Sequence, residues 1–360
     1  MKKYTFFAVA LATLAFVGCN KKDNNLVPDA NGKVTIMLSG EKYVSQDKQS
    51  FSGVGDQIFF TNDDYMYVNG VSCPVVCIPN PEMIGTSSTE SNLGSVAIPA
   101  EQIYNPLYAL YPAAIFTPGT AADYSDWTVN MKNEVVLIPK TVQLGYQTPM
   151  GAAQQIWPLT AYVPDVTLNN NIQLKNNVAL MTPCVIYGPG FISRFTNVKV
   201  TGETFDGTDY PTLKVQKVVL SSDNGRLTGE GHIAGLNTDE PYLVMDGAAP
   251  TEANPDVLTL WVTDPVVEPE GLEVLSNGES EVRLGHAPIA PVVEGNINVH
   301  LAVYFTLTYP GTNHTYACVY EGNGVFNNTN VKRSQRSSLM CDFFSTDGVS
   351  KVTSVVLQQE

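Results

Sequence analysis

The sequence predicts an all-β protein built from two tandem β-sandwich domains of Ig-like type. Short runs alternate between apolar and polar residues, which is the period of a half-buried strand. The clearest run places Leu301, Val303, Phe305, Leu307 and Tyr309 on one face. The 28 glycines and 23 prolines interrupt the chain so often that long helices have no room. At 360 residues the chain is too long for one compact sandwich.

Several shorter runs predict further strands. Val34 to Leu38 is an apolar run closed by Ser39 and Gly40. The runs Gln57 to Thr61 and Tyr65 to Val68 are joined by Asn62-Asp63-Asp64, which is typical of a hairpin. Trp127, Val129 and Met131 alternate with polar residues, as in a strand with one buried face.

One run changes its phase. Leu213 and Val215 are apolar at odd positions, whereas Val218 and Leu220 are apolar at even positions. A one-residue slip of this kind predicts a β-bulge or a strand that crosses between sheets.

The segment from Tyr162 to Asn171 is the best candidate boundary between domains, because Pro164, Asp165 and a run of asparagines follow an apolar strand. We therefore expect a signal peptide at 1–18, a lipidated tether at 19–32, an N-terminal domain at 33–166 and a C-terminal domain at 167–360.

The N-terminus predicts export. Lys2 and Lys3 precede an apolar run from Phe6 to Val17, followed by Gly18 and Cys19. The run is shorter than the ~20 residues of a membrane-spanning helix, so it predicts a secretory signal. A cysteine directly after such a run resembles the lipobox of bacterial lipoproteins, with Phe16 in place of the usual leucine. We expect lipidation of Cys19 and attachment to a membrane through the lipid; the alternative is an ordinary secretory cut that leaves Cys19 unmodified.

Charge and cysteine usage narrow the function classes. The net charge of −15 argues against binding nucleic acid or anionic lipid by charge. Five cysteines follow Cys19, at positions 73, 77, 184, 318 and 341, and an odd number cannot all pair within one chain. We expect buried thiols that act as small apolar side chains.

A search for catalytic and metal-binding patterns returns no strong signal, and we expect no enzyme activity, no cofactor and no metal. The acidic turns at Asn62-Asp63-Asp64 and Asp206-Gly207-Thr208-Asp209 offer oxygens to Ca²⁺, but acidic turns are commoner than calcium sites. The histidines at 232, 286, 300 and 314 do not cluster in the sequence. Trp127, Trp157 and Trp261 are candidates for stacking on sugars, with core packing favoured for Trp127 and Trp261.

The order of several segments resembles the fimbrillin family of Bacteroidetes, the fimbrial subunits and their relatives. A lipoprotein signal precedes a short first strand and a Lys-containing loop. The segments that carry the resemblance follow in this order: Lys33 to Ser39, Glu41 to Gly53, Gly55-Asp56-Gln57-Ile58, Tyr67-Val68-Asn69-Gly70, Tyr108-Ala109-Leu110-Tyr111-Pro112, Ile138 to Gln143, Pro149-Met150-Gly151-Ala152, Leu174 to Ile186, Leu213 to Ser222 and Leu227-Thr228-Gly229.

The resemblance implies how such a protein works. Members of the family fold as two transthyretin-like sandwiches and reach the outer membrane as lipoproteins. A protease cuts after the first strand, which then leaves. The groove accepts a strand from a neighbouring subunit, often its C-terminal segment, and the subunits polymerise. A sandwich lacking one strand exposes apolar core and unpaired backbone, and a donated strand satisfies both.

Mapped onto this chain, the resemblance implies a removable piece from Cys19 to about Lys42 or Lys48, cut after one of these lysines or by a protease of another specificity. The best-known members are cut after arginine, whereas the first arginine here is Arg194. If no cut occurs, the protein stays anchored and its first strand fills the groove. The candidate donor is Lys351 to Gln359, with Val352, Val355, Val356 and Leu357 as its apolar residues; an ordinary final strand in its own sheet is the alternative.

The sequence therefore favours a structural subunit of a fimbria that acts in adhesion, with other copies of itself or related subunits as partners. A host receptor or glycan is a further partner to consider. One alternative is a surface glycan-binding lipoprotein of a polysaccharide uptake system, which would need exposed aromatic side chains. The other is a hydrolase with two carboxylates that no motif marks.

Overall fold

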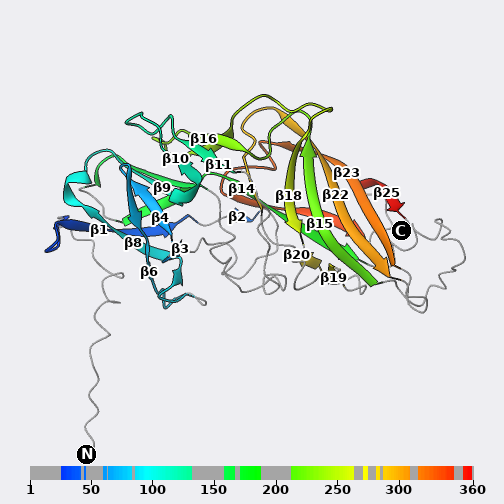
Figure 1. Ribbon diagram of the computed structural model, residues 1–360, viewed down its shortest axis with the longest axis horizontal. Coiled ribbons are helices and arrows are strands. Elements are labelled where there is room, and N and C mark those ends of the chain that lie inside the picture. The colour runs from blue at the N-terminus through cyan, green and yellow to red at the C-terminus, as the bar shows by residue number, and fades with distance from the viewer. Residues whose placement is uncertain are drawn as a thin grey trace, which may run out of the picture.

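The computed structural model describes residues 26–41, 44–45, 60–62, 64–82, 86–131, 158–166, 171–187, 212–262, 271–274, 281–283, 287–308, 315–343 and 352–358. These residues form 25 strands and two short 3-10 helices, and none of them lies in an α-helix. The predicted all-β fold class is confirmed. Figure 1 shows the early strands at one end of the long axis and the late strands at the other.

The first sandwich is one path of eight strands that folds over into two layers. The strand β13 belongs to both layers, because its first four residues pair with β1 and its last two pair with β12. The order along the path is β5 (Val71–Pro74), β4 (Tyr65–Val68), β9 (Leu107–Tyr111), β12 (Leu159–Val163), β13 (Asn171–Asn176), β1 (Lys33–Gly40), β8 (Leu93–Pro99) and β6 (Val76–Ile78). The two 3-10 helices are η1 (Ala100–Gln102) and η2 (Ala113–Ile115).

The predicted hairpin at Asn62-Asp63-Asp64 is wrong. The strand β3 (Phe60–Thr61) pairs with β7 (Glu90–Ser91), while β4 pairs with β5 and β9. The polar residues between β3 and β4 bind other segments: the Asn62 side chain accepts a hydrogen bond from the backbone N–H of Cys77 at 2.7 Å and donates one to Ser88 O at 2.6 Å. These contacts separate the two strands instead of closing a turn between them.

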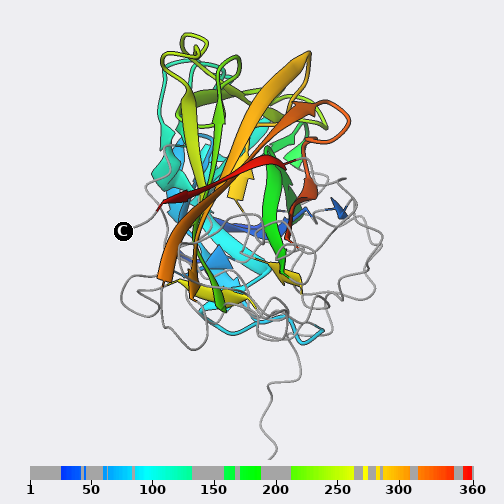
Figure 2. The same ribbon diagram turned by 90° about the vertical axis from the view of Figure 1, so that its right-hand side faces the viewer.

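The second sandwich consists of two sheets around a separate apolar core. Figure 2 shows its larger sheet facing the viewer. That sheet runs in the order β18 (Asp256–Val262), β15 (Thr212–Ser222), β22 (Asn296–Thr308), β23 (Thr315–Asn327) and β25 (Val352–Gln358), with β19 (Leu272–Val274) also paired to β15. The other sheet runs β2 (Val44–Ser45), β24 (Gln335–Phe343), β14 (Ala179–Tyr187) and β20 (Glu281–Arg283), with β21 (Ala287–Ile289) also paired to β14.

The predicted phase slip in β15 is confirmed as a bulge. The register shifts between Val215 and Lys217 against β22, and between Val218 and Val219 against β18. The extra residue at the bulge moves the inward-facing side chains from odd to even positions. Leu213, Val215, Val218 and Leu220 are therefore all fully buried.

A four-stranded sheet joins early and late parts of the chain. It runs β10 (Phe116–Thr117), β11 (Thr128–Asn130), β16 (Glu230–Ala234) and β17 (Tyr242–Met245). Its late residues Ile233 and Leu243 pack in the first core, so that core is not built from residues 33–166 alone. The division at 166/167 stays a prediction about domain organisation.

The predicted anchor at Cys19 lies outside the described residues. The end of the tether is described and turns into β1: the Asp29 carboxylate accepts hydrogen bonds from the backbone N–H groups of Asn31 at 2.8 Å and Lys33 at 2.9 Å. In the described part of the chain, no helix has the length and apolar character needed to cross a bilayer. Lipidation of Cys19 stays a prediction.

Candidate functional site

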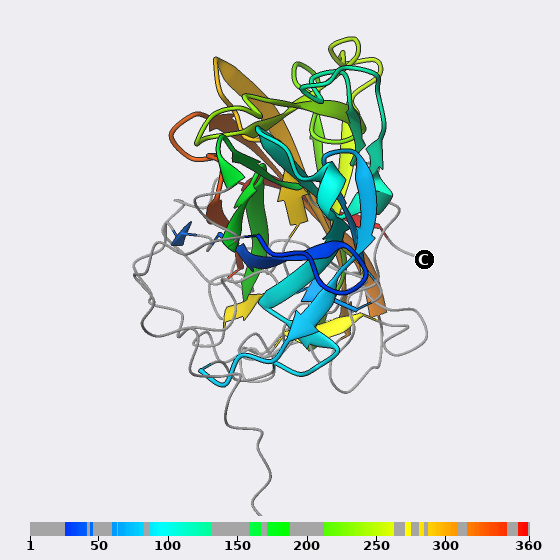
Figure 3. The ribbon, with the colours of Figure 1, turned by 90° about the vertical axis from the view of Figure 1, so that its left-hand side faces the viewer.

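The first strand, β1, lies in the middle of the first sandwich. Lys33 to Ser39 pair antiparallel with β8, and Met37 to Gly40 pair in parallel with β13. Both backbone edges of β1 are therefore hydrogen-bonded to neighbouring strands. Figure 3 shows this strand, in dark blue, crossing the near face of the molecule.

Three side chains of β1 complete the apolar core. Val34 is 3% exposed, Ile36 0% and Leu38 2%. They alternate with the less buried Thr35 and Met37, as a strand with one buried face requires. Burying each such side chain contributes roughly 1.5–3 kcal/mol. Removing β1 would therefore expose an apolar groove and two unpaired strand edges.

The chain leaves β1 through a tightly held glutamate, Glu41. Its backbone N–H donates to Leu174 O at 2.8 Å, which extends the pairing with β13. Its carboxylate accepts hydrogen bonds from the backbone N–H of Asn176 at 3.0 Å and from the Arg333 guanidinium at 2.7 Å. The Asn176 side chain returns a hydrogen bond to Glu41 O at 3.1 Å.

The partner of Glu41 comes from the far end of the sequence. Arg333 lies just before β24, a strand of the second sandwich, and also donates to Asn176 O at 2.9 Å. The two side chains are only 16% and 18% exposed, which makes this a partly buried ion pair. Lys175 approaches the same carboxylate more loosely, at 3.9 Å. The end of the first strand is thus tied to the second sandwich.

The next described residues complete the crossing between sandwiches. Val44 and Ser45 form β2, which pairs in parallel with Gln335 and Arg336 at the start of β24. The chain therefore passes from β1, in the middle of one sandwich, to a sheet of the other sandwich within a few residues. The predicted processing positions fall here or just beyond, but Lys42 and Lys48 themselves lie outside the described residues.

The last strand, β25, has a different position. Its residues 352 to 358 pair antiparallel with β23, at the end of the strand order of the large sheet. In the described residues no strand pairs with its other edge. Figure 1 places β25 at the opposite end of the molecule from β1. The backbone of Val352, Val355, Val356 and Leu357 is described, but their side chains are not. The structure therefore places the predicted donor in its own sheet, as an edge strand.

Sequence reasoning missed the contacts that hold the end of β1. Glu41 and Arg333 are separated by 292 positions, and nothing in the local pattern of either residue links them. The nearest signal is the position of Glu41, an acidic residue directly beside the candidate cleavage residue Lys42.

The first of the three tryptophans packs in the core, as favoured by the sequence. Trp127 is 6% exposed and makes edge contacts with Tyr67 and Tyr124, with ring centroids 4.8 and 5.1 Å apart. Its face is therefore not available to stack on a sugar. Trp157 and the side chain of Trp261 lie outside the described residues.

The described part of the acidic turn at Asn62 to Asp64 is engaged in hydrogen bonds to the protein. Tyr111 donates its phenol proton to the Asp64 carboxylate in a short hydrogen bond. Burial raises the pKa of Tyr111 well above its ordinary value, and the neighbouring Asp64 carboxylate raises it further. Within the described residues, no three His, Cys, Asp or Glu side chains gather in a group that could hold a metal ion. Asp63 and the acidic turn at 206–209 lie outside the described residues.

Three of the five cysteines after Cys19 are buried thiols, as predicted: Cys73, Cys77 and Cys318. Burial raises the pKa of the Cys73 thiol and raises that of Cys318 to about 12. A thiol with a raised pKa is a poor nucleophile at neutral pH, which fits a packing role. The side chains of Cys184 and Cys341 are not described.

The chain matches several solved structures along most of its length, and no family model or curated relative matches it. One is a fimbrial protein from Bacteroides vulgatus, with 11% identity, coverage of 91% of this chain and 99% of that one, and a TM-score of 0.40. Another is a proposed cell adhesion protein from Bacteroides eggerthii, with 14% identity, coverage of 93% and 98%, and a TM-score of 0.35. A third is a fimbrial assembly protein from Parabacteroides distasonis, with 10% identity, coverage of 91% and 100%, and a TM-score of 0.29.

The chain is thus similar along most of its length to proteins described as fimbrial or adhesion proteins of Bacteroides and Parabacteroides. Identities of 10–14% and TM-scores of 0.40 or less carry no argument about function. We therefore infer the function from the position and contacts of β1.

Proposed function

We propose that this protein is a structural subunit of a cell-surface fimbria, that it acts in adhesion, and that its subunits join by strand donation. The observation that carries the proposal is the position of β1. An N-terminal strand lies in the centre of a sandwich with a neighbour on each side, and Lys42 follows it directly in the sequence, with Lys48 a few residues after β2.

Removal of β1 would have a large physical effect, because this strand lies in the centre of its sandwich. A missing central strand leaves the backbone edges of β8 and β13 unpaired and uncovers the core around Ile36. Unpaired edges and apolar surface are the two properties that another strand satisfies by adding itself to a sheet. An inserted strand would restore both the hydrogen bonds and the buried area that β1 supplies.

The position of β25 makes it a suitable donor between molecules. It belongs to the second sandwich and the groove to the first, so the strand that fills a groove comes from a neighbouring subunit. A contact between two different surfaces of the same subunit repeats from copy to copy and builds an open filament. At alternate positions the donor offers Thr353, Val355 and Leu357, whereas β1 offers Val34, Ile36 and Leu38.

Limited digestion of the purified protein tests the proposal. A protease that cuts after lysine should release a fragment ending at Lys42 or Lys48, and oligomers should form after the fragment leaves. A variant with both lysines replaced by alanine should stay intact in this region and monomeric. Stable monomers after confirmed loss of β1 would contradict strand donation.

The lipid anchor at Cys19 belongs to the same proposal. It would hold the precursor at the outer membrane until β1 and the tether leave together. Mass spectrometry of the membrane-bound precursor should find an acyl-modified N-terminal cysteine, and a Cys19→Ala variant should be released from the membrane fraction.

A further inference from the structure

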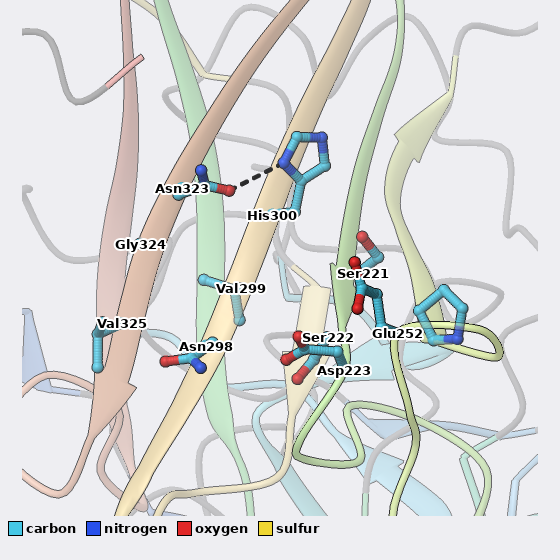
Figure 4. Close-up of a pocket in the computed structure, with 11 residues that line it drawn as sticks. Ser221, Ser222, Asp223, Glu252, Asn298, Val299, His300, Asn323, Gly324 and Val325 are labelled. Carbon is cyan, nitrogen blue, oxygen red and sulfur yellow. Dashed lines mark hydrogen bonds between the residues drawn. The ribbon is translucent and has the colours of Figure 1, made fainter. Parts of the chain in front are cut away.

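A pocket of about 510 Å³ opens on the outer face of the second sandwich. That volume lies within the range of about 300–1,000 Å³ that is usual for small-molecule sites. Figure 4 shows the lining residues, which come from the end of β15, the loop before β18, and the strands β22 and β23: Ser221, Ser222, Asp223, Glu252, Pro255, Asn298, Val299, His300, Asn323, Gly324 and Val325.

The strand register places the polar side chains together. His300 on β22 lies opposite Ser221 on one neighbouring strand and Asn323 on the other. Residues that lie directly opposite each other point to the same face of a sheet. Because the next residues along β22, Val299 and Leu301, face the core, His300 faces outward. His300 Nδ1 and Asn323 Oδ1 are 3.0 Å apart, a contact that fixes the orientation of both side chains.

Hydrogen bonds within the protein hold the walls in place. The Ser222 hydroxyl accepts a hydrogen bond from Gly225 N at 3.1 Å, and the Asn224 carboxamide oxygen accepts one from Asn298 N at 2.8 Å. Glu252 lies in a tight turn in which the backbones of Thr251 and Asn254 exchange two hydrogen bonds, at 3.2 and 2.9 Å. The site is therefore organised before any ligand arrives, which reduces the entropy lost on binding.

Three polar side chains remain available to a ligand. Within the described residues, no hydrogen bond engages the carboxylates of Asp223 and Glu252 or the carboxamide of Asn298. Carboxylates accept hydrogen bonds, and a carboxamide both donates and accepts them. These are the groups that bind several hydroxyls of one ligand at once.

The lining also excludes other ligand classes. It contains two carboxylates and no lysine or arginine, and the ring nitrogens of its one histidine, His300, already face Asn323 at 3.0 Å and Glu321 at 3.4 Å, so an anionic ligand would be repelled. It contains no aromatic ring, and its exposed apolar side chains are Pro255 and Val325, whereas Val299 is buried at 5% exposure. Two such side chains are too few to enclose a wholly apolar ligand. In the part of the chain that the structure describes, no metal-binding group of three acidic, histidine or cysteine side chains is present.

We propose that this pocket binds a saccharide without acidic groups, whose hydroxyls donate to Asp223 and Glu252 and exchange hydrogen bonds with Asn298. The C–H faces of the sugar pack against Val325 and Pro255. This site is separate from the groove of β1 and does not depend on strand donation. It would add a receptor-binding surface to each copy of the chain.

The test is titration of the purified full chain with single sugars, followed by isothermal calorimetry or ligand-observed NMR. The probes are the methyl glycosides of galactose, mannose and N-acetylglucosamine, together with glucosamine; glucuronate, sialic acid and methylammonium serve as comparison. We expect at least one of the four sugars to bind with a Kd on the order of 1 mM, and glucuronate and sialic acid not to bind.

Substitutions of two lining residues test whether the sugar binds in this pocket. Asn298→Ala and Glu252→Gln should each weaken binding about tenfold, because each removes a hydrogen-bonding group from the ligand. Both residues are exposed, and thermal unfolding should be unchanged in both variants. Glu240→Gln, an exposed acid outside the pocket, is the matched control and should bind like the parent protein.

Three outcomes would overturn the proposal: no sugar binds at concentrations on the order of 50 mM, glucuronate or methylammonium binds as tightly as any sugar, or binding survives both pocket substitutions. Oligomer formation after removal of β1 should be the same in Asn298→Ala as in the parent. Failure of this proposal and failure of strand donation are therefore distinguishable.

Discussion

The strands β1 and β25 are both short and apolar, but they occupy opposite kinds of position. β1 has a strand on each side and fills the centre of the first sandwich, whereas β25 pairs with β23 at the edge of a sheet in the second. A central strand is needed for the integrity of its sandwich, and an edge strand is the easier one to give up. In the mechanism proposed above, β1 is the strand that is replaced and β25 is the strand that replaces it.

The largest expected effect comes from removing β25. A chain that ends at Phe343 should fold and keep its first strand, because among the described strands β25 pairs with β23 alone. After removal of β1, this chain should form no oligomers by size-exclusion chromatography, since no donor strand is present. Continued polymerisation would assign the donor role to another segment.

The next effect is on the stability of the first sandwich. Ile36→Ala should lower the free energy of unfolding by about 3 kcal/mol, because it empties space in a fully buried site. Thr35→Ala, on the exposed face of the same strand, should change it by less than about 0.5 kcal/mol. Denaturant unfolding of both variants measures the difference, and equal losses would mean that β1 is not the core strand described above.

A smaller effect should follow from breaking the link between β1 and the second sandwich. Glu41→Gln leaves the Arg333 guanidinium partly buried without its carboxylate, which should cost about 1–2 kcal/mol. It should also speed proteolysis at Lys42, because the strand end is less firmly held. Lys175→Gln is the control: its ammonium lies 3.9 Å from the same carboxylate and is more exposed, so the loss should be below about 0.5 kcal/mol. An unchanged cleavage rate in Glu41→Gln would show that the ion pair does not control access.

The smallest effect is a change in thiol reactivity beside β25. Cys318 lies opposite Leu357 in the register between β23 and β25. Because burial raises the pKa of Cys318 to about 12, almost no thiolate forms at pH 8 and iodoacetamide should react slowly. In the chain that ends at Phe343 the reaction should be faster, and peptide mapping by mass spectrometry would assign it to Cys318. Equal rates would mean that β25 does not shield this position.

The raised pKa also predicts how Cys318 affects stability at alkaline pH. The folded pKa lies above the unfolded value of about 9, so the neutral thiol is favoured in the folded state. Its contribution is complete below pH 9 and is lost as the pH rises from about 9 towards 12. A Cys318→Ala variant should show a shallower loss of stability over this window.

Local patterns predicted much of the fold. The alternation in β22 and around Trp127 placed the buried faces correctly, and the phase slip at Leu213 to Leu220 placed the bulge in β15. These patterns succeed because the side-chain period of a strand depends on the backbone alone. The hairpin at Asn62 failed because a turn signal gives the residues that bend the chain and not the strand that pairs with the next one.

The sequence by itself determined that the chain is an all-β protein with an apolar strand near each end and a lysine-containing segment after the first. Tertiary structure alone decided that the first strand is central, that the last lies at an edge, and that Glu41 meets Arg333 across 292 positions. It also brought four separate segments together into the pocket around Asn298. The reason is physical: strand periodicity is a property of neighbouring residues, whereas sheet order and long-range ion pairs depend on which distant segments bury each other's surface.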